Sequence, residues 1–249
     1  MAGHSKFKNI MHRKGAQDKK RAKIFSRLGK EISVSVKAGG SDPDINIRLR
    51  SAIAAAKSQN MPKDNIERAI KKGEGNDPDS NYEEVRYEGY GPDGIAIIVE
   101  AMTNNKNRTA AEIRSTFQKY GGNLGETGSV SYNFKRLGTI LVDKNLAKED
   151  EIFEFVVDHG SEDLEVGEEE YVVYCDQKNL HVLNDKIINK FGETKFSQLI
   201  WKSENNINLK KDSAEKLFKL LNTLEDNEDV QDVSSNFEAS EEILQSFTQ

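Results

Sequence analysis

Hydrophobic positions repeat with helical spacing through the first part of the chain. One series recurs every four residues and marks one face of a helix: Ile24, Leu28, Ile32 and Val36. This series predicts a helix that ends at Gly39 and Gly40, because glycine commonly follows the last turn of a helix. The basic residues of this region fall mostly before and around the apolar series.

Two shorter helices are expected next. Residues 44–58 show the same spacing, with four residues predicted to face inward: Ile47, Ala52, Ile53 and Ala56. The third helix should begin at Pro62 and close at Gly73, since proline suits the first turn and Asp64 favours the N-terminus. Three short helices predict an all-α domain.

The pattern changes after the breaker-rich stretch 73–81, where short alternating runs predict β-strands. The first run predicts two strands, a helix and a strand, at 83–90, 94–102, 107–120 and 129–135. The second run predicts strand, helix, strand, strand, helix and strand, at 138–143, 149–159, 162–167, 170–176, 179–191 and 196–203. This βαββαβ order resembles the split arrangement of ferredoxin-like domains.

The last part of the chain predicts a strand at 205–209, a helix at 212–224 and a strand at 229–235. If the middle βαββαβ block is an insertion, these elements complete the sheet that begins at residue 83. The chain after Phe237 is acidic, and we expect it to be loose. The length of 249 residues agrees with two or three small domains, because a domain averages about 150 residues.

The net charge of −6 hides a division of the chain into a basic and an acidic part. Residues 1–75 carry 18 Lys and Arg against 7 Asp and Glu, a net charge of +11; the rest carry 18 against 35, a net charge of −17. The basic end predicts a polyanionic partner, with nucleic acid favoured. An anionic membrane surface or a merely solvated helix face is the alternative, and the few bulky apolar residues in 5–23 weaken the membrane version.

Several other classes of site have little support in the sequence. The longest apolar run, 95–99, is far shorter than the roughly 20 residues of a membrane-spanning helix. The four histidines lie far apart, and the single cysteine, Cys175, leaves no Cys-rich metal site and fits a reducing compartment. We therefore expect a cytoplasmic protein that is not an enzyme, with no metal, no cofactor, no small-molecule substrate and no membrane partner.

A glycine-rich segment at 121–128 has the composition of a phosphate-binding loop but the wrong position. Phosphate loops run from a strand into a helix, whereas this segment follows a predicted helix and precedes a predicted strand. It also lacks a Lys-Ser or Lys-Thr pair after its last glycine. A structural turn is the preferred interpretation.

Several distinctive motifs follow one another along the whole chain. They are Ala2–Lys6, Asn9–Ile10, His12–Asp18, Lys20–Arg21, Arg48–Arg50, Asn60–Ile66, Arg68–Gly73, Tyr87–Pro92, Asn107–Thr109 and Gly121–Val130. In this order they resemble the YebC/PmpR family. Two positions depart from the family pattern: Phe7 stands where Trp is usual, and Asn104 stands where Asp is usual, which removes a charge.

The resemblance implies an α+β multidomain fold, in which an all-α N-terminal three-helix domain precedes two α+β domains, the third ferredoxin-like and inserted in the second. With the sequence pattern, this places the domains at 1–75, at 80–135 together with 205–240, and at 136–204. The resemblance also implies a DNA-binding regulator of transcription. The alternative it implies is a ribosome- or RNA-associated translation factor, which activates translation or relieves stalling on proline-rich sequences.

We predict nucleic-acid contacts at the basic end and at the connection between the second and third helices. In that connection, Met61 either packs between the helices or meets a base while Lys63 meets a phosphate, and we favour the contact. The predicted nucleic-acid-binding residues are Lys6, Lys8, His12, Arg13, Lys14, Lys19, Lys20, Arg21, Lys23, Arg48, Arg50, Met61 and Lys63. No catalytic residue is predicted.

Overall fold

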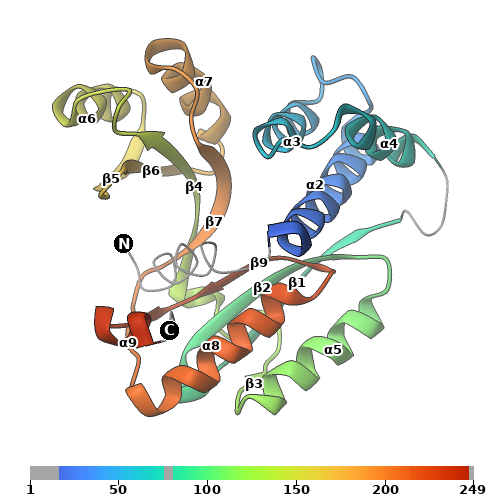
Figure 1. The fold of residues 1–249 in the computed structure, drawn as a ribbon, viewed down its shortest axis with the longest axis vertical. Helices are drawn as coiled ribbons and strands as arrows, with labels where there is room; N and C mark the ends of the chain where they lie inside the picture. The colour runs from blue at the N-terminus through green and yellow to red at the C-terminus, as the bar shows by residue number, and fades with distance from the viewer. Residues whose placement is uncertain (1–16, 76–80, 247–249) are drawn as a thin grey trace. The chain divides into compact units, whose positions relative to one another are not determined.

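The computed structural model describes residues 17–75 and 81–246 (Figure 1). Contacts between residues divide this part of the chain into two compact units. The smaller unit covers residues 132–206, and the larger unit holds the described residues on either side of it. The larger unit therefore combines the N-terminal helices with a sheet whose strands come from both sides of the smaller unit.

Three helices form the N-terminal part of the larger unit: α2 (Gln17–Gly39), α3 (Ile47–Ser58) and α4 (Lys63–Glu74). Their apolar faces meet in one core, in which Ile32 and Leu49 are fully buried. The side chain of Asn46 caps α3 by accepting a hydrogen bond from the backbone N–H of Leu49 at 3.0 Å. The prediction that Ile47 faces inward is wrong, because the cap starts the helix there and leaves its side chain 50% exposed.

The larger unit also contains a four-stranded antiparallel sheet of order β3-β1-β2-β9. Its strands are β1 (Glu83–Tyr90), β2 (Ala96–Thr103), β3 (Asn123–Leu124) and β9 (Val230–Ser235). The 3-10 turn η2 (Pro92–Gly94) joins the first two strands. Figure 1 shows α5 (Lys106–Lys119) and α8 (Lys211–Asp226) on one face of this sheet. Phe117 and Leu217 of these helices are fully buried against Ile97 and Val99 of β2.

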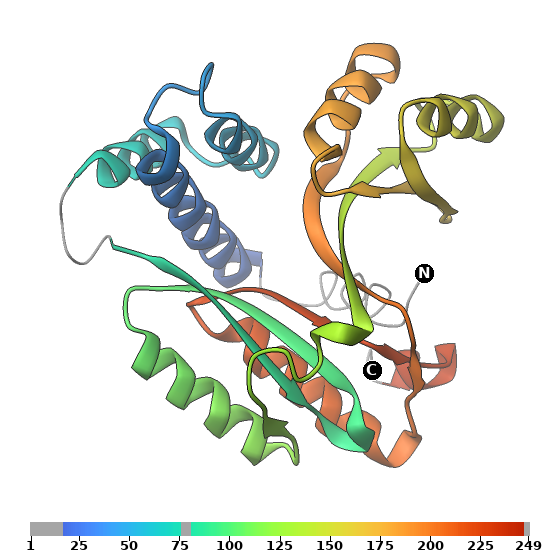
Figure 2. The same cartoon turned by 180° about the vertical axis from the view of Figure 1, so that it is seen from behind.

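The smaller unit has the ferredoxin-like arrangement. Its elements are β4 (Phe134–Asp143), α6 (Glu149–Asp158), β5 (Ser161–Val166), β6 (Glu170–Asp176), α7 (Leu180–Phe191) and β7 (Phe196–Ser203). The strands form an antiparallel sheet of order β5-β6-β4-β7. Figure 2 shows both helices of this unit from behind, and Ile152 and Leu183 from them share a core with Ile140 of the sheet. The predicted βαββαβ order and fold class are confirmed.

The strand predicted at 129–135 is wrong. The backbone there passes through η3 (Ser131–Asn133), and β4 continues from Phe134 through the strand predicted at 138–143. The backbone N–H groups of Val130 and Ser131 donate to the carboxylate of Glu88, each at 2.9 Å. These hydrogen bonds to a side chain replace the strand-to-strand hydrogen bonds that alternation alone suggested.

The described residues after Phe237, which end at Ser246, form regular structure and not the loose tail that the composition predicted. β10 (Phe237–Glu238) pairs in parallel with β8 (Ile207–Asn208), and α9 (Glu241–Ser246) follows. Phe237 is fully buried and Leu244 is 3% exposed, both in the core of the larger unit. The acidic composition of the tail concealed these apolar positions.

The domain boundaries at 1–75, 80–135 with 205–240, and 136–204 stay predictions, because compactness alone does not show that a segment folds by itself.

Among the described helices, none combines the length and the apolar composition that crossing a membrane requires.

Candidate nucleic-acid interface

The structure describes six of the thirteen predicted contact side chains. Five residues lie outside the described part of the chain: Lys6, Lys8, His12, Arg13 and Lys14. Lys19 and Lys20 lie in the first turn of α2, but their side chains fall outside the description. The remaining six are Arg21, Lys23, Arg48, Arg50, Met61 and Lys63.

Two cations of α2 are held by the end of α8. Lys23 and Arg27 both donate to the backbone carbonyl of Glu225, Arg27 at 2.6 Å, and Lys23 also pairs with Asp226 at 3.2 Å. The last carbonyls of a helix carry partial negative charge, which favours cations there. Burial lowers the pKa of both Lys23 and Arg27. Lys23 is therefore engaged within the larger unit, which the charge count did not reveal.

Asp229, which directly precedes β9, joins three elements of the larger unit. Its carboxylate is 2.8 Å from Nζ of Lys30 on α2 and 2.6 Å from the guanidinium of Arg108 on α5. It also accepts hydrogen bonds from the hydroxyls of Thr103, at 3.0 Å, and Thr109, at 2.8 Å. Burial by itself raises the pKa of Asp229, but the donors Lys30, Arg108 and Thr109 outweigh it and hold the pKa well below the usual range. A buried charge is stable only with such partners.

Arg48 is shared by two carboxylates. Its Nε donates to Glu31 of α2 at 2.7 Å, and its guanidinium also pairs with Glu84 of β1. The hydrogen bond to Glu31 is the main reason that the pKa of Arg48 lies above its ordinary value. The side chain thus links α3 to α2 and β1.

Exposed cations lie on both α3 and α4. Arg50 and Lys57 lie seven residues apart on α3 and share a face, and Arg68 and Lys71 are neighbours at i and i+3 on α4. All four side chains are exposed, and within the described part of the chain none has an ion-pair partner. We call these four residues the α3–α4 cations.

Three of the α3–α4 cations were not predicted from the sequence: Lys57, Arg68 and Lys71. The signal available in the sequence was their place outside the buried face of each helix, which includes Ala56 on α3 and Ile66 on α4. The guanidinium of Arg68 also donates to the backbone carbonyl of Asp64 at 3.2 Å. Arg50 was predicted and is exposed. Arg21 is also exposed, and its guanidinium lies 5.4 Å from the ring centroid of Phe25.

The connection between α3 and α4 buries Met61 and exposes Lys63. Met61 is only 8% exposed and belongs to the core of the three helices, which favours the packing alternative over a contact with a base. The side chain of Lys63 is 87% exposed and pairs only loosely with Glu67, at 3.5 Å. A phosphate contact by Lys63 stays a prediction.

Replacing Met61 with alanine should lower the free energy of unfolding by about 2–5 kcal/mol, because the substitution leaves a cavity in the small helical core. Lys63→Ala is the control, and it should change stability by less than about 0.5 kcal/mol because its side chain is exposed. Urea unfolding of both variants measures the difference. Near-native stability of Met61→Ala would contradict the packing described here.

The glycine-rich segment contains the short strand β3, and Glu88 holds both the segment and the residues that follow it, since the backbone N–H of Gly125 donates to the Glu88 carbonyl at 2.8 Å. Glu88 is 1% exposed, and its carboxylate accepts the backbone N–H groups of Val130 and Ser131 and lies 3.1 Å from Nε of Arg86. Burial by itself raises the pKa of Glu88, but the backbone donors and Arg86 outweigh it, so the pKa is lower than usual. These internal contacts support the structural interpretation of the segment.

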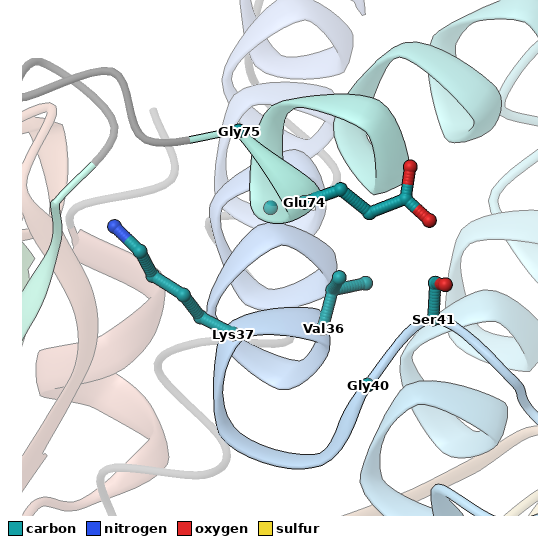
Figure 3. A pocket seen from close by; sticks show the side chains of 7 residues that line it. Val36, Lys37, Gly40, Ser41, Glu74 and Gly75 are labelled. Atoms are coloured by element: carbon teal, nitrogen blue, oxygen red, sulfur yellow. The ribbon is translucent and has the colours of Figure 1, made fainter.

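A cavity of about 350 Å³ lies where the C-terminal ends of α2 and α4 meet (Figure 3). Figure 3 shows the side chains of Lys37 and Glu74 pointing away from each other. Nζ of Lys37 donates to Asn81 at 3.0 Å.

Across the described residues, no three or more His, Cys, Asp or Glu side chains gather closely enough to hold a metal ion. The absence of catalysis and of cofactors stays a prediction.

Comparison with known proteins covers nearly the whole chain. The family model for the TACO1/YebC protein N-terminal domain matches residues 5–76. A second model, labelled Transcrip_reg and described as the TACO1/YebC second and third domain, matches residues 82–237. The crystal structure of a conserved hypothetical protein from Aquifex aeolicus is similar with a TM-score of 0.83 and 44% sequence identity, over 90% of this chain and 93% of that chain.

Proposed function

Because the chain belongs to the TACO1/YebC family, we propose that it is a non-enzymatic, nucleic-acid-binding regulator of gene expression in the cytoplasm, acting first of all on DNA in transcription. The label of the model that matches residues 82–237 supports a regulatory role at the level of the family. Nucleic-acid binding rests on one observation, the exposed α3–α4 cations, none of which has an ion-pair partner within the described part of the chain.

The proposed contact is with the phosphate backbone. Lysine and arginine side chains on two neighbouring helices neutralise phosphates and release bound counterions, which supplies affinity without reading the sequence. Lys63 lies in the first turn of α4 and adds a further exposed cation to this helix. The acidic remainder of the chain repels phosphate and leaves the helical end to make the contact.

An RNA or ribosomal target is the second candidate. It is favoured by the same cations, because phosphate contacts alone do not distinguish DNA from RNA. Crosslinking the protein in growing cells and sequencing the attached DNA and RNA together would separate the two. Recovery of DNA supports a transcriptional role, whereas recovery of ribosomal RNA supports a role in translation.

The triple variant Arg50→Glu, Lys57→Glu and Lys71→Glu should weaken binding to a DNA duplex or a structured RNA by on the order of 100-fold at low salt, because phosphates then face carboxylates. The control reverses three exposed lysines far from these helices in sequence: Lys178, Lys210 and Lys216. It has the same net charge and should bind much better than the triple variant. Equal affinities in a fluorescence titration would remove the proposed interface.

A further inference from the structure

The smaller unit exposes more apolar surface than the larger one. Eight of the ten large apolar side chains that are exposed in the described chain lie within residues 132–206. Phe153 and Val157 are each 51% exposed, and they are neighbours at i and i+4 on α6. An exposed pair of this kind, next to a hollow, is typical of a binding surface rather than of a scattered surface residue.

The hollow lies between α6 and the edge strand β5. It has a volume of about 180 Å³ and is lined by Phe153 and Val157 of the helix and by residues 161–164, including Leu164. A cavity of about 150 Å³ holds a molecule the size of benzene, so this hollow has room for one apolar side chain. We call it the α6–β5 groove.

Unpaired carboxylates border the groove. Asp150, Glu154 and Asp158 follow one another at i, i+4 and i+8, beside the row of Phe153 and Val157. All three are exposed, and within the described residues none has a hydrogen-bond or ion-pair partner for its carboxylate. Asp150 lies in the first turn of α6, where a negative charge is favourable, but Asp158 ends the helix, where a negative charge is unfavourable, and it follows Glu154 at i+4, a spacing at which like charges repel.

The acids of the neighbouring strand are different, because the unit's own lysines pair with them. Glu162 pairs with Lys135 at 2.6 Å, and Lys202 lies 3.0 Å from both Asp163 and Glu165. Of the acids next to the groove, those of β5 are therefore paired within the unit, and the row on α6 is not.

We propose that the α6–β5 groove binds a Lys- and Arg-rich segment of another protein, which inserts one apolar side chain between Phe153, Val157 and Leu164. Complementary charge selects this occupant, because the carboxylate row attracts cations and repels nucleic acid, anionic lipid and the same face of a second copy. The apolar anchor supplies burial that charge alone does not. This binding goes beyond the proposed contact with nucleic acid and does not depend on it.

The first test is an NMR titration of the full chain with a synthetic peptide that has a single Leu flanked by Lys and Arg. We expect amide shifts confined to α6 and β5. Phe153→Ser, and separately the triple variant Asp150→Asn, Glu154→Gln and Asp158→Asn, should each raise the Kd about tenfold or more. The matched controls Val182→Ser and Asp185→Asn change exposed residues on α7 and should stay within about twofold.

The proposal is overturned if the Leu→Ser version of the peptide binds as well, if the α7 controls weaken binding as much, or if the shifts spread over the acidic surface. It is equally overturned if DNA, RNA or self-association shifts the same amides. A photoreactive Phe153→p-benzoylphenylalanine variant gives a second test in cells. A crosslink to a Lys- and Arg-rich segment of another protein supports the proposal, and a crosslink to nucleic acid or to a second copy of the chain contradicts it.

Discussion

Replacing Asp229 with asparagine should lower the free energy of unfolding of the larger unit by about 3–5 kcal/mol, as expected when one member of a buried ion pair loses its charge. The side chains of Lys30 and Asp229 are 11% and 7% exposed, so the lysine left behind has little water to replace its partner. Arg108 and the two threonine hydroxyls lose a charged acceptor in the same step. Urea unfolding of the full chain measures the change.

Asp226→Asn is the matched control, because Asp226 lies three residues away and also pairs with a lysine of α2. Its side chain is 86% exposed, so its loss should cost at most about 1 kcal/mol. Equal losses for the two variants would contradict the role assigned to Asp229.

The stability difference between the wild-type chain and Asp229→Asn should also depend on pH. The pKa of Asp229 is lower in the folded chain than in the unfolded one, so its carboxylate stabilises the fold fully above the unfolded pKa of about 3.9. The contribution falls as the pH drops below that value towards the folded pKa. The two unfolding curves should therefore differ most near neutral pH and approach each other in acid, and a difference that grows in acid would be inconsistent with this account.

Glu88→Ala should cost about 3–5 kcal/mol and release the turn at 121–131. The substitution leaves the buried N–H of Val130 and the partly buried N–H of Ser131 without this acceptor and removes one partner of Arg86. Glu88→Gln keeps one carbonyl acceptor and should lose less. Hydrogen exchange locates the effect, since the amides of Val130 and Ser131 should exchange much faster in Glu88→Ala.

Glu83→Ala is the control for this position. Glu83 lies on the same strand, its side chain is 57% exposed, and its partner Lys106 is 53% exposed, so the loss should stay below about 1 kcal/mol. Unchanged exchange at 128–131 in Glu88→Ala would show that Glu88 does not hold the turn.

Periodicity was enough to predict most elements of this fold. The inserted strands and helices were found because their apolar residues alternate or repeat at helical spacing over whole elements, as in α6, with Ile152 and Val156 buried. The strand predicted at 129–135 failed because alternation does not reveal that a distant side chain, Glu88, accepts the local backbone N–H groups. The expectation of a loose tail was wrong because its few apolar residues, such as Leu244, stand among acidic ones and give no clear periodicity.

The candidate site was harder to predict than the fold. A charge count treats Lys23, Arg48 and Arg50 alike, but the first two are paired with carboxylates far away in the sequence or on another helix. Only the tertiary structure separates these from the exposed Arg50. The burial of Met61 could not be predicted for a related reason, since a motif shows that a residue is distinctive and not whether it packs or binds.

The salt dependence of nucleic-acid affinity measures how many phosphates the cations of the chain neutralise. For the full chain and a DNA duplex or structured RNA, a log-log plot of affinity against salt should fall with a slope that corresponds to about 5–9 neutralised phosphates. In the triple variant Arg50→Glu, Lys57→Glu and Lys71→Glu, about three of these should disappear. Affinity that does not change with salt, or a variant with the slope of the wild-type chain, would contradict a phosphate contact through α3 and α4.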